Sequence, residues 1–271
     1  MGRFILNQDL HLHSLLSACS RDPRQTAADI LKAAKENGLS TICLTDHYWD
    51  SAVSGASDWY APQNFDHISA SRPLPQADGI RFLFGCETDL DQNMTLGLPS
   101  SRYDDFDFIV IPTTHLHMKG FTLSERDAES TSARARLWVE RLDAVLQMEL
   151  PFYKVGLAHL TCKLIGRTPQ ERLAVLDRIP QNEMERLFQK AATLGVGIEL
   201  NMDDMTFSDE EADSVLRIFR TARNAGCKFY AASDSHHPEH FDAYRPIMER
   251  AIDLLGLCET DKFCIGSPKN T

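Results

Sequence analysis

The stretch from Thr26 to His47, TAADILKAAKENGLSTICLTDH, contains the pattern that decides the fold. Thr26 is typical of a helix N-cap, and Gly38 is typical of the residue that ends a helix. A short apolar strand over residues 40–44 follows directly and leads to Asp46 and His47. The stretch therefore predicts a helix, a buried strand, and polar side chains just past the strand.

The same pattern recurs along the chain. Further helices are predicted over residues 182–194 and after the capping box Ser208 and Glu211, and a glycine ends each of them. Seven strands are predicted in total, over residues 4–10, 40–44, 81–84, 106–111, 153–158, 196–198 and 228–232. Strands that alternate with helices favour an α/β fold with a parallel sheet.

The length of the chain suits one large unit. It has 271 residues, and an α/β barrel takes about 250. We find no internal repeat and no Pro/Gly/Ser-rich linker, so residues 1–271 are expected to form a single domain. Turn residues mark 48–79 as a long loop across the active face, and the tail 267–271 is expected to be frayed.

Charge and composition exclude several classes of protein. The net charge is −11, which speaks against binding duplex nucleic acid through its phosphates. No apolar run approaches the length of a membrane span, and no signal peptide is recognised. The seven cysteines are scattered and form no CxxC pair, so we expect a cytoplasmic protein with thiols that are mostly buried and inert.

Histidines gather where the strands end. Eight of the ten lie just past a predicted strand: His11, His13, His47, His115, His117, His159, His236 and His237. The carboxyl ends of parallel strands meet at one face, so these side chains are expected to share a site. Imidazole with carboxylate suits Zn, Mn or Fe. In His11-x-His13, strand alternation places both rings on one side of the chain.

Six short stretches, in order along the chain, resemble the polymerase and histidinol phosphatase (PHP) family of metal-dependent phosphoesterases. They are Asp9–Ser14 (DLHLHS), Leu44–His47 (LTDH), Gly85–Glu87 (GCE), Thr114–His115 (TH), Ala158–His159 (AH) and Ser233–His236 (SDSH). The resemblance implies a distorted, seven-stranded (β/α) TIM-like barrel. It also implies a centre of two or three divalent metal ions that hydrolyses phosphate esters.

The resemblance also implies a role for each residue. One metal would be held by His11, His13, Glu87 and Asp234. Glu87 would bridge to a second metal on His115 and His159, with His117 as the alternative to His115. His47 and His236 would contribute to a third site. Asp46, which we assign to catalysis, would accept a hydrogen bond that orients a histidine.

One departure from the family concerns the third metal. Many members have His or Asp soon after the HxH motif, whereas here the nearby candidates are Cys19 and Asp22. A thiolate is a good ligand for zinc. The sequence leaves open whether a third metal binds and which of the two residues ligates it.

The expected reaction is hydrolysis of a small phosphomonoester or a nucleotide-type phosphate ester by a metal-bridging hydroxide. Lys119 and Arg167, which closely follow His115 and His159, are the preferred clamps on the substrate phosphate. Two alternatives stay open. One is an amidohydrolase-like enzyme, a class that commonly places a lysine mid-barrel, and the other is a non-catalytic, metal-stabilised binding module.

Two further groups of side chains are interpreted from the sequence. Trp49, Trp59 and Tyr60 form either an aromatic wall against the substrate or the packing of the long loop. The arginines at 134, 136 and 141, with Glu140 and Asp143, are interpreted as an exposed helix face of mixed charge.

Overall fold

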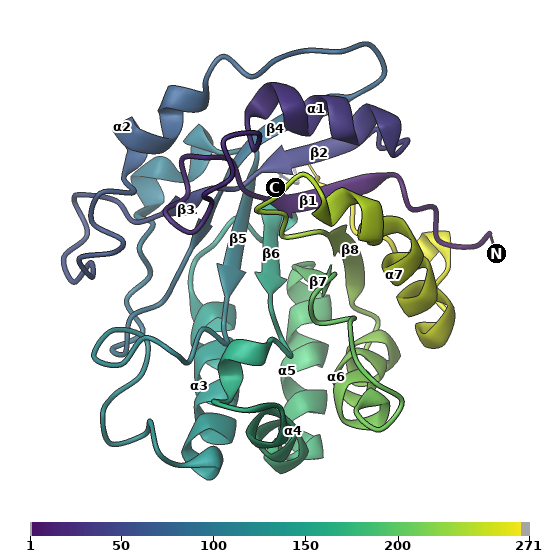
Figure 1. Cartoon of the computed structure of the whole chain (residues 1–271). Coiled ribbons are helices and arrows are strands. Elements are labelled where there is room, and N and C mark those ends of the chain that lie inside the picture. The colour runs from purple at the N-terminus through teal and green to yellow at the C-terminus, as the bar shows by residue number, and fades with distance from the viewer. Residues whose placement is uncertain (1, 267–271) are drawn as a thin grey trace.

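The computed structural model describes residues 2–266 and shows a nearly closed parallel barrel (Figure 1). Seven strands follow one another in the order β1, β2, β4, β5, β6, β7, β8, and all pair in parallel. Their bounds are Gln8–Leu12, Thr41–Leu44, Arg81–Thr88, Phe108–Pro112, Val155–Ala158, Gly197–Asn201 and Lys228–Ala232. The predicted seven-stranded barrel is confirmed, and a short additional strand, β3 (His47–Tyr48), pairs with β4.

Backbone hydrogen bonds between the first and last strands bring the barrel close to closure. The amide of Asp234 donates to the carbonyl of His11 at 2.8 Å, and the amide of His13 donates to the carbonyl of Ser235 at 3.0 Å. These two bonds lie at the carboxyl ends of β1 and β8. They therefore place the HxH motif directly beside the Asp-x-His motif, which lies more than 200 residues later in the chain.

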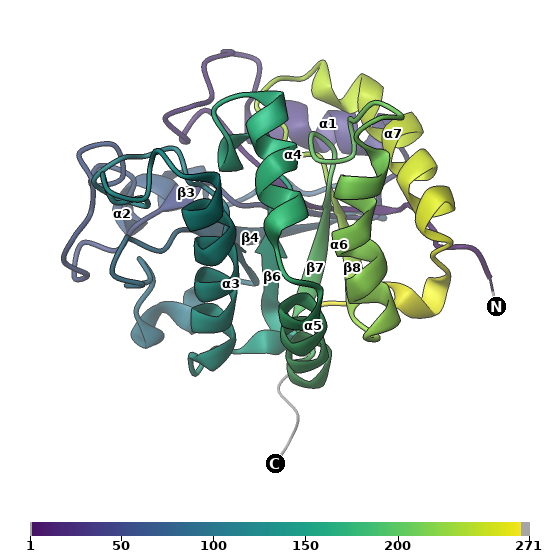
Figure 2. The same ribbon diagram turned by 90° about the horizontal axis from the view of Figure 1, so that it is seen from below.

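Helices cover the outside of the barrel. They are α1 (Ala27–Glu36), α2 (Phe65–Ile68), α3 (Thr131–Gln147), α4 (Pro169–Arg178), α5 (Gln181–Leu194), α6 (Ala212–Asn224) and α7 (His240–Leu255). Figure 2 shows α3, α5 and α6 side by side, in agreement with their contacts. The Thr26 hydroxyl caps α1 by accepting from the amide of Asp29 at 3.2 Å. Among the described residues, no helix combines the length and the apolar character needed to cross a membrane.

The strands alternate between an inward and an outward face. In β5, Phe108 and Val110 belong to the cluster inside the barrel, whereas Ile109 and Ile111 pack under the helices. Phe108 and Tyr230 fill the barrel so tightly that a Cβ added at Gly156 would lie 2.5 Å from the Tyr230 hydroxyl. One end of the barrel is thus filled with aromatic rings, and the polar side chains occupy the other end.

Several strand boundaries differ from the prediction, and two of the strands concerned carry proposed ligands: β1, which ends at Leu12 rather than residue 10, and β4. Strand β1 begins at Gln8 rather than residue 4, because the preceding segment bonds to the chain after α7: the amide of Ile5 donates to Glu259 at 2.7 Å. Strand β4 continues to Thr88, since Glu87 still pairs with Val110 of β5. His11 and Glu87 therefore lie within strands and not in the segments after them.

The predicted long loop over residues 48–79 contains only short elements, namely the end of β3, helix α2 and a 3₁₀ turn over Ser69–Ser71. Its Trp49 and Tyr60 are buried and pack with Phe121 in a separate apolar cluster. This cluster fastens the loop to the barrel. The expectation for the tail 267–271 lies outside the described residues.

The interpretation of the α3 arginines as an exposed face is wrong for two of them. Arg134 and Arg141 are buried, and only Arg136 is exposed. Arg134 donates to the carbonyls of Leu116, Ala128 and Ile165, at 2.5–3.3 Å. A guanidinium has five N–H donors, so backbone carbonyls of the surrounding loops can satisfy it inside the protein.

Candidate metal centre

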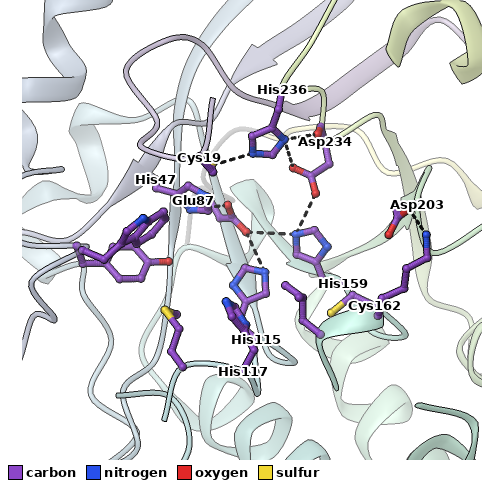
Figure 3. Close-up of a pocket in the computed structure, with 15 residues that line it drawn as sticks. Cys19, His47, Glu87, His115, His117, His159, Cys162, Asp203, Asp234 and His236 are labelled. Carbon is purple, nitrogen blue, oxygen red and sulfur yellow. Dashed lines mark hydrogen bonds and ion pairs between the residues drawn. The ribbon is translucent and has the colours of Figure 1, made fainter. Parts of the chain in front are cut away.

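The predicted ligands meet at the carboxyl ends of the strands, around a cavity of about 700 Å³ (Figure 3). The eight side chains proposed as ligands come from six different strands or the segments that follow them. Six of these line the cavity: His47, Glu87, His115, His159, Asp234 and His236. His11 and His13 lie just behind them and are fully buried.

Glu87 lies at the middle of this group. Its Oε2 atom is 2.8 Å from Nδ1 of His47 and 3.4 Å from Nε2 of both His11 and His13. Its Oε1 atom is 3.3 Å from Nε2 of His159 and 3.9 Å from Nε2 of His115. The two oxygens of one carboxylate thus face two different sets of imidazoles.

Asp234 faces the same space from the opposite side of the barrel. Its Oδ1 atom lies 3.1 Å from Nε2 of His13 and 3.6 Å from Nε2 of His11, and its Oδ2 atom lies 3.6 Å from Nε2 of His159. Asp234 and His159 both adopt left-handed backbone conformations, with φ of 51° and 59°. Such conformations cost on the order of 1–3 kcal/mol in a residue other than glycine and are concentrated at functional sites.

Buried carboxylates orient two of the histidines. Glu199 accepts a hydrogen bond from Nδ1 of His11 at 2.6 Å, and Asp89 accepts one from Nδ1 of His115 at 2.9 Å. In each ring this leaves Nε2 as the nitrogen that faces Glu87. Arg141 in turn donates to Asp89 at 2.9 Å, so a fully buried ion pair holds the carboxylate that orients His115.

Asp46 acts on a histidine through a serine. It accepts hydrogen bonds from the hydroxyls of Ser14 and Ser17, both at 2.7 Å. The Ser17 oxygen in turn lies 2.8 Å from Nδ1 of His13. The direct contact with a histidine that the sequence suggests is therefore replaced by the relay Asp46–Ser17–His13. Because Ser17 donates to Asp46, its oxygen accepts from His13, and Nε2 of His13 points to the centre.

At the rim of the cavity, Cys19 adjoins two histidines. Its sulfur lies 3.0 Å from Nε2 of His236. Burial raises the pKa of the Cys19 thiol, but hydrogen bonds with His236 and His47 outweigh that effect and bring the pKa to about 7. Asp22, the other candidate, instead pairs with Arg24 at 2.5 Å. Of the two residues, Cys19 is the one placed beside His47 and His236.

The two predicted phosphate clamps lie elsewhere. Among the described residues, the cavity is lined by one cationic side chain that is not a histidine, Lys163, which pairs with Asp203 at 2.5 Å. Lys119 and Arg167 are exposed and both pair with Glu129, outside the cavity. The polypeptide after each strand turns away from the site before it reaches these residues.

Of the three aromatic residues in the long loop, two lie at the cavity and one packs the loop onto the barrel. Trp59 and Tyr60 line the cavity, together with Met118 and Leu164 on the other loops. Trp49 does not, because it is buried in the packing of the loop. His115 and His117 both line the cavity, but His115 is the one whose Nε2 faces Glu87.

The donor set fits metal ions. Both oxygens of Glu87 are buried and accept no hydrogen bond, although histidine nitrogens surround them. Nε2 of His11 and Nε2 of His13 lie 3.0 Å apart. When both rings are neutral, the hydrogen bonds at their Nδ1 atoms leave a lone pair on each Nε2. Two such lone pairs beside a buried carboxylate require positive charge between them, which a metal ion would supply. Three groups have ligand atoms within 4.8 Å of one another: His11, His13 and Asp234; His11, Glu87 and His159; His13, His47 and His236.

A family model, the PHP domain, matches residues 9–203, which is most of the chain. The chain belongs to the PHP domain family. The matched region contains all but two of the proposed ligands, Asp234 and His236.

The proteins that this PHP domain resembles include two phosphatases. One is a probable phosphatase from Caldicellulosiruptor saccharolyticus, 27% identical over 106 residues, which cover 39% of this chain and 40% of that protein. The other is the solved structure of a histidinol phosphate phosphatase from Lactococcus lactis in complex with zinc, L-histidinol and phosphate. It shares 17% identity, covers 90% of this chain and 93% of its own, and has a TM-score of 0.52, which supports the fold.

Sequence reasoning missed the residues that orient the ligands. Asp89 lies two residues after Glu87, and Glu199 lies in the last strand but one. Asp89 directly follows β4, and its spacing of two residues from Glu87 is a signal, because side chains two residues apart in extended chain point to the same side. Arg141 had no such signal, since only the packing of α3 against the barrel brings it to Asp89.

Proposed function

We propose that this PHP domain is a metal-dependent phosphoesterase that hydrolyses a small phosphomonoester. The carrying observation is the position of Glu87, whose two oxygens each face a different set of imidazole nitrogens at 2.8–3.9 Å. A carboxylate in that position suits a bridge between two cations. The named phosphatases among the similar proteins support phosphate esters as the class of substrate.

In this proposal one ion would be held by His11, His13, Glu87 and Asp234, and a second by Glu87, His115 and His159. A weaker third site would be formed by His47, His236 and Cys19. Bound divalent ions at such a centre supply a nucleophilic water at neutral pH and neutralise the oxygens of the phosphate. Zn, Mn and Fe all suit the mixture of imidazole and carboxylate.

The protein's own contribution is to fix the ligands before the substrate arrives. Glu199 holds His11, Asp89 holds His115, and Asp46 holds His13 through Ser17. Such outer hydrogen bonds set the ring orientation and the protonated nitrogen of each histidine. Asp46 is therefore a positioning residue in this proposal.

The rest of the cavity is suited to the organic part of the ester. Trp59, Tyr60, Met118 and Leu164 give it an apolar wall beside the ligands. Its volume of about 700 Å³ lies in the range of small-molecule sites. Among residues 2–266, the one lysine that lines the cavity is Lys163, which is exposed and paired with Asp203 and therefore does not correspond to the mid-barrel lysine typical of an amidohydrolase.

The test is phosphate release from 4-nitrophenyl phosphate before and after removal of metal. We expect a chelator to abolish the reaction, and Mn or Zn to restore it. The control is Glu87→Gln, purified in the same way, which should stay inactive after metal is added back. Full activity of the metal-free protein would contradict the proposal, as would equal activity of the variant.

A further inference from the structure

A second cavity, of about 220 Å³, lies next to the first at the N-terminus of α4. Lys163 lines both cavities. Three cationic side chains, Lys163, Arg167 and Arg172, line the smaller one, against a single carboxylate, Glu211. The mechanism proposed above uses none of the three.

Arg172 is the unusual member of this group. Its side chain is only 2% exposed, yet its Nη2 atom is buried without a hydrogen-bond partner. The neighbouring Nε donates to the carbonyl of Thr161 at 2.6 Å, and Nη1 lies 3.8 Å from Glu211. Since a buried guanidinium normally uses its donors, Arg172 has an unused donor on a side chain that lines the cavity.

The start of α4 adds further attraction for an anion. Thr168 caps the ten-residue helix by accepting from the amide of Glu171, and Pro169 occupies its first turn. Pro169 has no N–H, and the amides of Glu171 and Arg172 are bonded to Thr168, so the attraction for an anion comes from the dipole at the helix N-terminus, which the Glu171 carboxylate partly offsets. Gly166 packs so closely that a Cβ there would lie 2.4 Å from the amide nitrogen of Arg172, which fixes the preceding loop against the helix.

The remaining two cations can turn towards a ligand at little cost. Arg167 pairs with Glu129 and Glu171, and Lys163 pairs with Asp203, but all of these side chains are partly or largely exposed. Exposed ion pairs contribute little to stability, so they can exchange partners. Arg167, which the sequence suggested as a clamp on the reacting phosphate, is thus placed for a different anion.

We propose that the smaller cavity is an oxyanion subsite, which takes a phosphate or carboxylate group on Arg172, Arg167 and the N-terminus of α4. Two sources fit this chemistry: a second anionic group on the substrate, reaching past Lys163, or free inorganic phosphate. Only the first of these rests on the proposed function.

Anion binding is tested first, with probes that need no turnover. Crystals of the protein are soaked in selenate, whose anomalous signal locates the ion, and sulfate binding in solution is followed by thermal shift. We expect a selenate peak beside Arg172 and a sulfate affinity at least fivefold weaker in Arg167→Ala. The control Arg178→Ala, at the other end of α4, should bind sulfate like wild type. A cavity without selenate, or equal sulfate affinity in Arg167→Ala, would overturn the proposal.

The source of the anion is tested with two primary alkyl esters that share a three-carbon chain and differ only in the group at its far end, 3-hydroxypropyl phosphate and propane-1,3-diol bisphosphate. If the second group comes from the substrate, kcat/KM should favour the bisphosphate about tenfold, and Arg167→Ala should remove that preference while Arg178→Ala keeps it. Selenate binding without the preference assigns the subsite to free phosphate. Failure of both esters to release phosphate contradicts the proposed function alone, because the selenate result does not depend on hydrolysis.

Discussion

Glu87 is the residue on which the geometry of the centre depends. Burial alone would raise its pKa, but the imidazoles of His47 and His11 lower the pKa well below its usual value. The carboxylate is therefore ionised, and it accepts no hydrogen bond that would share its charge. In the proposed centre, a side chain in this state would bridge two cations, and its removal should affect more than one of them.

We therefore expect Glu87→Gln to lower the amount of bound metal by more than one ion per chain. The neutral amide keeps the size of the side chain but removes the charge that both ions share. Asp234→Asn should lose about one ion. Elemental analysis of the purified variants measures both values, with Asp203→Asn at the rim of the cavity as the control. Wild-type metal content in Glu87→Gln would show that the bridge is wrongly assigned.

Replacing Cys19 tests the proposed third metal site. We expect two firmly held ions and a weaker third, and Cys19→Ala should lose only the third. With cobalt in place of the native metal, a thiolate ligand adds a charge-transfer absorption that the variant would lack. Anomalous scattering at the metal edge reports the occupancy of each ion. An unchanged occupancy in Cys19→Ala would mean that the thiol only packs beside His236.

The raised pKa of Asp204 predicts that the stability of the fold depends on pH. Asp204 is buried behind His159, and burial raises its pKa from 3.8 to about 6. The folded protein then holds this proton more tightly than the unfolded chain does. Stability should therefore fall as pH rises from about 4 to about 6, by on the order of 2–3 kcal/mol. Asp204→Asn should lack this part of the pH dependence in urea unfolding at matched metal loading, whereas an identical profile would contradict the raised pKa.

At the scale of elements, α3 does more than cover the sheet. Arg141 on its inner face donates to Asp89, which directly follows β4, and Asp89 accepts from His115. The same guanidinium also donates to the carbonyl of Thr113, at the end of β5, at 2.9 Å. The helix thus carries a fixed charge into the barrel, and the orientation of one proposed ligand depends on it.

Arg141→Met should be strongly destabilising for this reason. It leaves Asp89 buried without its ion-pair partner, which costs about 3–5 kcal/mol. Arg136→Met, on the exposed face of the same helix, should change the free energy of unfolding by less than about 0.5 kcal/mol. Urea unfolding of the two variants provides the comparison. If both changed stability equally, the buried ion pair would not be the cause.

At the scale of the whole molecule, the barrel gathers negative charge at its centre. Glu87, Glu199 and Asp234 from three strands converge within a chain whose net charge is already −11. Such a concentration of carboxylates opposes folding unless cations neutralise it. The proposed metal ions would therefore link opposite sides of the barrel as well as serve catalysis.

Removal of metal should consequently lower the thermal midpoint. Ligand at 100 times its dissociation constant stabilises a folded protein by about 2.7 kcal/mol. For a chain of this size that corresponds to a shift of about 5–10 °C. Calorimetry with and without chelator measures the shift, and Glu87→Gln should show a much smaller one. Equal midpoints for loaded and stripped wild type would refute the stabilising role.

The sequence by itself determined the order of helices and strands and the face on which the histidines gather. Both follow from local rules: apolar periodicity, capping residues such as Thr26, and the shared direction of parallel strands. Only the tertiary structure decided which side chains surround the site at a distance. Arg141 reaches Asp89, and Glu199 reaches His11, through the packing of separate elements. Arg167 is displaced because, after β6, the chain turns towards the start of α4, a path set by loop packing that no periodicity encodes.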